Sequence, residues 1–276
     1  MNVSNRWQNA IGNNNRRNDF DVRSNRWNNW GGQVRNQWNY GHRHDDWFNR
    51  DWWRRHPPRP GCWHPWRSVN VNVYRPGVWW VAPTWAATTS WFTWPTTTTV
   101  WSQPVAYDYG EGGNVTYQDN RVYVNGTEVA SADEFAQSAM DLATVEPPAS
   151  EEEAEKAEWL PLGTFAVSSG EKDVSPDRSV QLAVSRDGIV AGTLYDARTD
   201  KSEDVQGSVD RETQRVAVRV GDSDTVVAET GLYDLTLDEA PLLVHFGTER
   251  TEEYLLVRLD PPADADGPDG GGNDAS

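Results

Sequence analysis

The sequence predicts an all-β C-terminal domain, in which about eight antiparallel strands form a meander that closes into a small barrel or a flattened sandwich. Short apolar runs recur between residues 159 and 260, and several alternate apolar and polar residues, the pattern of strands with one buried face. Turn signals separate these runs at the spacing of all-β domains. No intervening stretch is long or periodic enough for a crossover helix, so neighbouring strands should be antiparallel.

The strands of this domain are expected at its apolar runs, which are residues 159–167, 180–184, 189–195, 205–209, 216–220, 225–230, 242–246 and 254–259. Asp187-Gly188 predicts a tight hairpin, because both residues can adopt positive φ. Val218 and Val257 lie in the middle of strands and are predicted to point into the core, whereas Arg219 should face the opposite way.

A smaller unit is predicted for residues 107–145. Three very short strands are expected, with turns at Asp119-Asn120 and Asn125-Gly126. Ser131 and Glu134 have the spacing of a capping box, which predicts a helix that continues to about Thr144. Residues 146–158 then form an acidic linker that is solvated and has some helical character.

Residues 1–76 form a basic arm rich in Asn, Arg and Trp. They contain thirteen Arg, no Lys and five Asp, which gives +8, so the remaining 200 residues carry −25 of the total of −17. We see neither helical nor strand periodicity and few aliphatic residues, which predicts disorder. Such an arm suits an anionic partner, and its candidate surface-binding residues are Arg16, Arg17, Arg26, Trp27, Trp30, Trp52, Trp53, Arg54 and Arg55.

Two further segments have unusual compositions. Residues 77–106 carry no charge and are rich in Trp and Thr, which leaves three alternatives: a transmembrane helix, an interfacial or loosely packed segment, or an uncharged linker. The tail, residues 261–276, is predicted to be disordered. Its run from Asp264 to Asp269 is loosely similar to a calcium loop but lacks the bidentate twelfth ligand and the flanking helices of an EF-hand.

No catalytic, cofactor or metal site is predicted. His245 is the only histidine outside the arm, and a partly exposed strand position is favoured over a catalytic triad because no activated Ser is evident. The spacing of the donors in the arm fits no closed zinc pattern; these donors are His42, His44, His56, Cys62 and His64. There is no phosphate-binding loop or dinucleotide fingerprint, and no recognition helix for specific nucleic-acid binding.

Several motifs occur in an order that resembles a known family. They include Trp159–Val167, Gly192–Asp196, Thr230–Thr236, Val244–Gly247 and Arg250–Leu259. Over about residues 107–259 the chain is similar to a planctomycete family of mu-protocadherin-like cell-surface proteins. The resemblance implies an envelope, surface or secreted location but no cadherin chemistry and no functional residues. Members usually carry a secretion signal, and residues 1–7 lack the apolar region of one.

These observations favour a non-enzymatic envelope or cell-surface protein without a cofactor. Its β domain would be a structural or interaction module, and its arm would attach to lipid headgroups or acidic polysaccharide. Association between the basic arm and the acidic body is a further alternative. The rival hypothesis is a periplasmic or extracellular β barrel that binds a small ligand, because closed meanders can hold one. A hydrolase centred on His245 is the third hypothesis.

Overall fold

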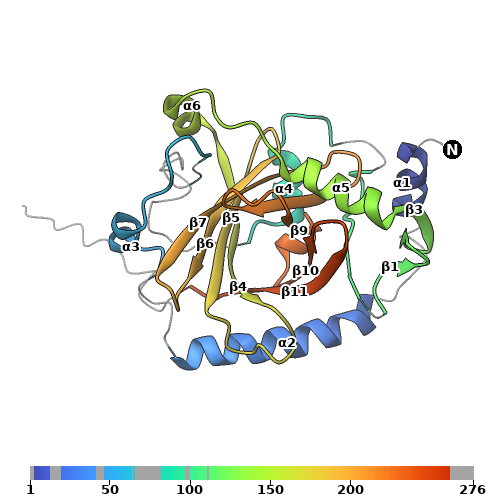
Figure 1. Ribbon diagram of the computed structural model, residues 1–276, viewed down its shortest axis with the longest axis horizontal. Coiled ribbons are helices and arrows are strands. Elements are labelled where there is room, and N and C mark those ends of the chain that lie inside the picture. Colours follow the sequence, from blue (N-terminus) through green and yellow to red (C-terminus); the bar gives the residue numbers. More distant parts are fainter. Residues whose placement is uncertain are drawn as a thin grey trace, which may run out of the picture.

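The computed structural model describes residues 3–12, 20–41, 47–63, 65, 82–96, 100–110 and 112–261. Its main body is a closed antiparallel barrel (Figure 1). The strands of the barrel are β4 (Trp159–Ser168), β5 (Arg178–Ser185), β6 (Ile189–Asp196), β7 (Lys201–Val209), β8 (Arg215–Val220), β9 (Val226–Gly231), β10 (Glu239–Phe246) and β11 (Arg250–Arg258). Each apolar run that the sequence predicts as a strand overlaps one of these, so the predicted fold class is confirmed.

The barrel is an up-and-down meander, in which every strand pairs with the next in the chain and β11 pairs with β4 to close the ring. The alternative of a flattened sandwich is therefore settled in favour of a barrel. Closure leaves no unpaired strand edge in the ring. The turn between β5 and β6 has Gly188 at φ 85°, in line with the expected hairpin.

The inner face of the barrel is lined by every second residue of each strand. On β8, Val216 and Val218 face inward, while Ala217 packs outward against other elements. Leu242 and Val244 on β10 alternate in the same way with Leu243, which belongs to a separate outer cluster. The barrel is thus apolar on the inside and is also packed against other elements over much of its outside.

The unit before the barrel matches its prediction. β1 (Val115–Gln118), β2 (Arg121–Val124) and β3 (Thr127–Ser131) form an antiparallel sheet that leads into α5 (Ala132–Ala143). The capping box is present, because Glu134 N donates to the Ser131 hydroxyl at 3.2 Å and Ser131 N donates to the Glu134 carboxylate at 2.9 Å. α5 buries Ala139 and Ala143 against the outer face of β8 and β9.

The N-terminal arm contains helices within its described parts, which differs from the expected absence of periodicity. They are α1 (Val3–Gly12), α2 (Phe20–Gly41) and α3 (Arg50–Arg55). α2 lies along one side of the barrel, opposite α5 (Figure 1). Trp30, Val34 and Trp38 share one face of α2 at four-residue spacing and are buried. The tryptophans supply the apolar surface that aliphatic residues usually provide, so packing compensates for the low helix propensity of Asn.

α2 also explains why the predicted direction of Val257 is wrong. Val218 lines the inside of the barrel as expected. Val257 is fully buried, but it lies on the outer face of β11 in a cluster with Trp27 and Trp30. Because β11 is covered on both faces, alternation alone could not show which set of side chains faces inward.

The described part of the uncharged segment closes one end of the barrel, which none of its three alternatives anticipated. α4 (Trp85–Trp91) and the residues after it insert Phe92, Trp94 and Trp101 into the main core cluster. A Cβ atom at Gly188 would lie 2.5 Å from the Trp94 ring, so this turn needs glycine for space as well as for its φ. We call residues 85–96 and 100–101 the aromatic cap. No helix in the described ranges is both long and apolar enough to cross a bilayer.

The acidic linker contains a short helix, α6 (Glu151–Lys156), whose first turn is capped by the Ser150 hydroxyl. This agrees with the expected solvated linker of partly helical character. A single 3-10 turn, η2 (Asp234–Thr236), connects β9 to β10. The predicted tail lies outside the described residues from position 262 onward, and with it the calcium-like run that starts at Asp264.

Candidate functional site

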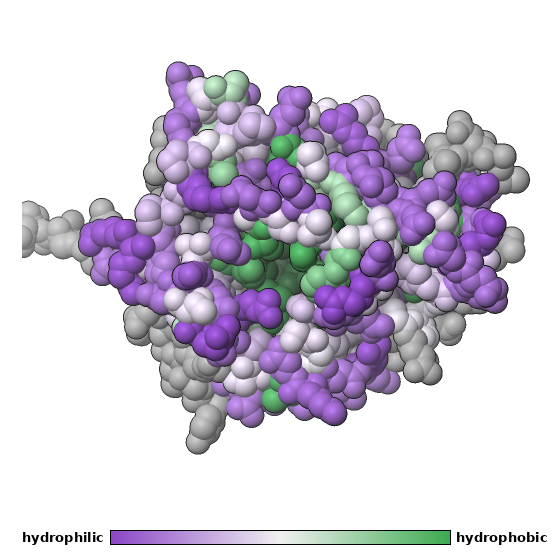
Figure 2. All heavy atoms as spheres, viewed as in Figure 1, coloured by the Kyte–Doolittle hydropathy of each residue, from purple (hydrophilic) through white to green (hydrophobic). Residues whose placement is uncertain are grey.

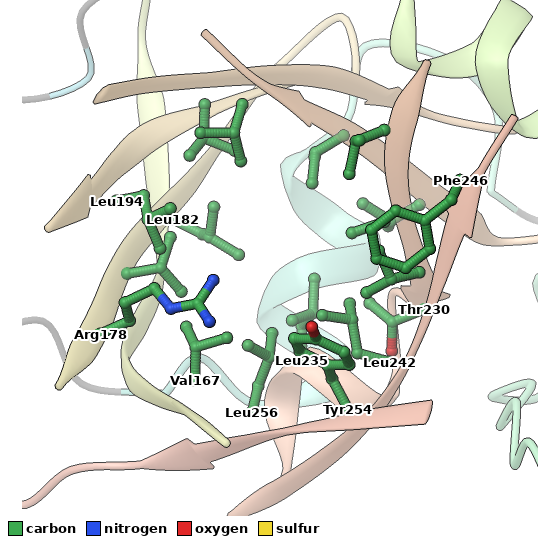
Figure 3. Close-up of a pocket in the computed structure, with 18 residues that line it drawn as sticks. Val167, Arg178, Leu182, Leu194, Thr230, Leu235, Leu242, Phe246, Tyr254 and Leu256 are labelled. Atoms are coloured by element: carbon green, nitrogen blue, oxygen red, sulfur yellow. The ribbon is translucent and has the colours of Figure 1, made fainter. Parts of the chain in front are cut away.

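The barrel encloses a cavity of about 170 Å³. Its wall comes from all eight strands, with Leu235 added by η2 (Figure 3). Nearly all of the lining side chains are aliphatic or aromatic: Val167, Val180, Leu182, Leu194, Val205, Val216, Val218, Val220, Val226, Ala228, Leu235, Leu242, Val244, Phe246, Tyr254 and Leu256. Arg178 and Thr230 complete the lining. The cavity follows directly from the period-two pattern, because every strand turns its apolar set toward the barrel axis.

The cavity is open at one end and closed at the other. Its lining includes residues near the end of β4 and the start of β5, such as Val167 and Arg178, which mark the open end. Figure 2 shows an apolar hollow here, surrounded by a hydrophilic rim. The aromatic cap closes the other end, where the Trp91 indole donates to Val184 O at 3.1 Å and the Trp101 indole donates to Arg211 O at 2.8 Å.

Three polar side chains line this apolar cavity. The Thr230 hydroxyl donates to Pro241 O at 2.7 Å, so its hydrogen bond is made within the barrel wall. Tyr254 is half-buried and contributes a phenol. Arg178 begins β5 and is the only charged residue among the described residues that line the cavity, and Figure 3 shows its guanidinium turned over the hollow. Such a site can hold an apolar molecule and orient it by a few polar contacts.

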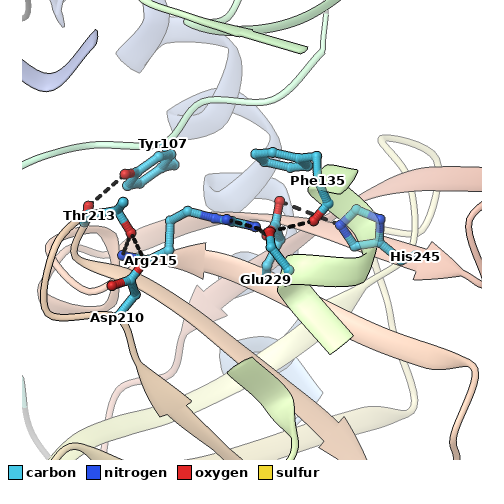
Figure 4. Close-up of polar contacts among 8 residues, drawn as sticks. Tyr107, Phe135, Asp210, Thr213, Arg215, Glu229 and His245 are labelled. Atoms are coloured by element: carbon cyan, nitrogen blue, oxygen red, sulfur yellow. Dashed lines mark hydrogen bonds and ion pairs between the residues drawn. The ribbon is translucent and has the colours of Figure 1, made fainter. Parts of the chain in front are cut away.

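A second polar cluster lies on the outside of the barrel, beneath α5. Arg215, Glu229 and His245 project outward from the neighbouring strands β8, β9 and β10 (Figure 4). Glu229 pairs directly with Leu243 and Ala217, so His245 and Arg215 are its diagonal neighbours, two residues along each adjoining strand. One Glu229 oxygen accepts from Arg215, and His245 Nε2 lies 3.5 Å from the other.

This outer cluster is fully enclosed. Arg215 is 3% exposed, whereas Glu229 and His245 are 0% exposed. Arg215 also donates to the Ser138 hydroxyl at 3.0 Å and lies 4.2 Å from the centre of the Phe135 ring. The expectation of a partly exposed His245 is therefore wrong, because α5 covers this face. A substrate has no access to His245 in this arrangement, which gives the hydrolase hypothesis no support.

Charge pairing decides the ionisation of the cluster. Burial raises the pKa of Glu229, but the adjacent Arg215 charge and the His245 ring outweigh it, and the pKa lies below its ordinary value. Burial lowers the pKa of Arg215, and Glu229 reverses that effect, so the pKa is raised. Both groups are charged at neutral pH, and together they form a buried ion pair with a structural role.

The tryptophans predicted to bind a surface instead lie mostly against the barrel. Trp27 and Trp30 on α2 are buried, and their indoles donate to Asp108 Oδ1 at 2.9 Å and to the Ser168 hydroxyl at 2.8 Å. Trp52 is 1% exposed and packs edge-on against Tyr195 at 5.0 Å. Trp53 is half-buried beside Trp52. The structure thus brings these side chains together as packing groups.

The arginines predicted to bind a surface differ in their surroundings. Arg26 pairs with Glu171 at 2.7 Å and with Glu253 at 3.2 Å, so its charge is balanced by carboxylates of the body. Arg54 and Arg55 at the end of α3 are exposed, and Arg54 pairs with Asp51 on the same helix at 2.9 Å. Arg16 and Arg17 lie outside the described residues.

Ion pairs join the basic arm to the acidic body of the same chain. Besides Arg26, three other arginines in the described part of the arm pair with the body. Arg6 lies 3.8 Å from Glu128. Arg35 pairs with Glu239, and Arg59 pairs with Asp204 at 2.9 Å and with Asp222 at 2.7 Å.

The histidine and cysteine donors of the arm do not converge where they are described. His56 is buried, with Nδ1 3.0 Å from Trp52 O and Nε2 3.1 Å from Asp200 Oδ1. Cys62 is a free, half-buried thiol whose pKa is raised by burial. No group of three or more potential ligands for a metal ion forms in the described part of the chain. The other three donors, His42, His44 and His64, lie outside it.

Fold and site together define an antiparallel eight-stranded barrel with an apolar cavity that is open at one end. Comparisons of this chain with protein-family models, with curated proteins and with solved structures return no match. A function must therefore be inferred from the geometry itself.

Sequence reasoning missed two features of that geometry, the Arg215–Glu229 pair and Arg178. The sequence did contain a signal for the pair. Arg215 and Glu229 are opposite charges at outward positions of two apolar strands that follow one another in the chain.

Proposed function

We propose that this protein is a non-enzymatic binding protein that holds a small apolar molecule inside its barrel. The observation that carries the proposal is the cavity of about 170 Å³, which has an almost wholly apolar wall and one open end. A dry cavity of about 150 Å³ with similar lining is large enough for benzene. Each buried methylene stabilises a complex by about 0.8 kcal/mol, which gives a chain of several carbons useful affinity.

The test uses a neutral dye so that charge plays no part. N-phenyl-1-naphthylamine should gain fluorescence on mixing with the full chain, and 1-decanol should displace it. Ala228 lines the cavity on β9, and Ala228→Phe fills it with a ring. We expect Ala228→Phe to weaken dye binding at least tenfold, because the ring occupies the volume that the ligand needs.

The matched control adds the same ring elsewhere. Gln137 is exposed on α5, away from the cavity, and Gln137→Phe should leave the affinity for the dye unchanged. Circular dichroism of both variants checks that the barrel is folded. Equal dye binding by the two folded variants would show that the cavity is not the binding site, and the proposal would fail.

A second proposal concerns attachment to an anionic surface, in keeping with the envelope or surface location implied by the family resemblance. The observation that favours it is the exposure of Arg54 and Arg55 on α3. Arginine pairs bidentately with phosphate and carboxylate, and about 1 kcal/mol per residue is typical near an anionic membrane.

We expect the full chain to sediment with vesicles that contain phosphatidylserine, and less so above about 0.15 M salt, where the screening length is about 8 Å. Changing Arg54 and Arg55 together to Gln should weaken binding tenfold or more. The control changes Lys172 and Arg198, which are exposed on the barrel, to Gln. Equal losses in both pairs would mean that total charge, and not α3, determines binding.

A further inference from the structure

Arg178 is the feature of the cavity that an apolar ligand alone does not explain. Its side chain is exposed at the open end, yet its guanidinium is turned over the hollow (Figure 3). None of the described residues forms an ion pair with it. A guanidinium offers five N–H donors in a fixed plane, a geometry that matches a carboxylate or phosphate.

Two carboxylates that share the rim with Arg178 are engaged elsewhere. Asp196 lies directly across from Arg178 on β6, but it accepts from Thr199 N at 3.0 Å and lies 3.9 Å from Arg198. Asp173 accepts from the Ser169 amide and hydroxyl, both at 2.9 Å. The guanidinium therefore keeps its donors available to a molecule that enters the cavity.

The charge of the rim limits the kind of anion that fits. Asp173, Asp177 and Asp196 line a depression that shares Val167 and Arg178 with the open end. Three carboxylates and two arginines, Arg178 and Arg198, make the net charge of this depression negative. A single negative charge can pair with Arg178 there, whereas a doubly charged group meets stronger repulsion. The volume of about 170 Å³ restricts the apolar part to a single chain rather than two.

We infer that the cavity binds single-chain carboxylates of the fatty-acid type, with the tail among the aliphatic side chains and the carboxylate paired with Arg178. This inference rests on the proposed binding function and adds its ligand class. The tail provides affinity through burial, while the head group sets orientation and selects against neutral and cationic molecules of equal length.

The experiment compares head groups on one tail. Decanoate, 1-decanol, decylamine and decyl phosphate compete for bound N-phenyl-1-naphthylamine at pH 7.4, below their micellar concentrations. We expect decanoate to bind about five- to tenfold more tightly than 1-decanol. This is the gain in affinity expected from one partly exposed, charge-assisted hydrogen bond to Arg178. Decyl phosphate, which is largely a dianion at this pH, and decylamine should both bind more weakly than decanoate.

Arg178→Gln removes the charge and keeps polar bulk, so it should reduce the preference for decanoate over 1-decanol to twofold or less without altering 1-decanol binding. Arg198→Gln removes a nearby charge that does not line the cavity and should preserve the preference. Equal binding of decanoate and 1-decanol, or tighter binding of decylamine or decyl phosphate, would overturn the inference while leaving the proposed function intact. Failure of every ligand to displace the dye would count against the proposed function itself.

Discussion

Replacing Glu229 with Gln should lower the free energy of unfolding by about 3–5 kcal/mol, the range found when one partner of a buried ion pair is removed. Arg215 would then remain charged at 3% exposure with no carboxylate beside it. Its other contacts, the Ser138 hydroxyl and the Phe135 ring, cannot neutralise it. Urea denaturation of the wild type and the variant measures the loss.

The same variant has a distinct dependence on pH. Because the pKa of Glu229 is lowered in the folded protein, its stabilisation is present above the unfolded value of about 4.3 and is lost as pH falls through the folded value. The stability difference between wild type and Glu229→Gln should therefore be largest near neutral pH and shrink in acid. Asp234 acts in the opposite sense, since burial raises its pKa well above normal, but it is common to both proteins and cancels in the difference.

Two controls separate charge from packing. Glu158 pairs with Arg186 at the surface, where both side chains are more than 40% exposed, and Glu158→Gln should cost less than about 1 kcal/mol. Changing Arg215 to Met and Glu229 to Leu together should cost less than Glu229→Gln alone, because no charge is stranded. If Glu229→Gln were as mild as Glu158→Gln, Arg215 would have access to water that this structure does not show.

Replacing Trp30 with Ala should also cost about 3–5 kcal/mol. Trp30 is 3% exposed between α2 and the barrel, stacks on Trp27 with ring centres 5.5 Å apart, and donates to the Ser168 hydroxyl. The substitution removes the ring, which leaves a cavity, and it removes the hydrogen bond that the Ser168 hydroxyl accepts. Denaturant midpoints and near-ultraviolet circular dichroism report the loss.

The control for Trp30→Ala is Asn29→Ala, which changes the exposed face of the same helix. We expect Asn29→Ala to change stability by no more than about 0.5 kcal/mol. Equal effects of the two substitutions would mean that α2 is not docked in solution. The arm would then be free to act through its tryptophans at a surface, as its composition suggested.

The fold class could be predicted because the strands of the barrel have strong local signals. Alternation in Val216, Val218 and Val220 marks β8, and the turn at Gly188 follows from the backbone freedom that only a few residues have. The capping box at Ser131 and Glu134 needs residues only three apart. These features depend on neighbours in the chain, so sequence alone determines them.

The roles of the N-terminal tryptophans depended on the tertiary structure. The apolar residues of α2 have helical spacing: Trp27, Trp30, Val34 and Trp38. The many Asn residues around them weaken this signal. The helix is stabilised by packing against the outer face of β11, which the sequence does not reveal. The same contact reverses the expected direction of Val257. Alternation divides the side chains of a strand between two faces. When both faces are buried, it cannot show which face points into the barrel.

Sequence by itself determined that this chain forms an antiparallel β meander preceded by a short sheet and a helix, because hydrophobic period, turns and caps are local properties. Tertiary structure alone decided that the meander closes, that the aromatic cap seals one end, and that Arg178 lies at the other. It also decided that Arg215, Glu229 and His245 meet beneath α5. Cavities and charge clusters form from residues on separate strands, and only the register and curvature of the closed barrel bring them together.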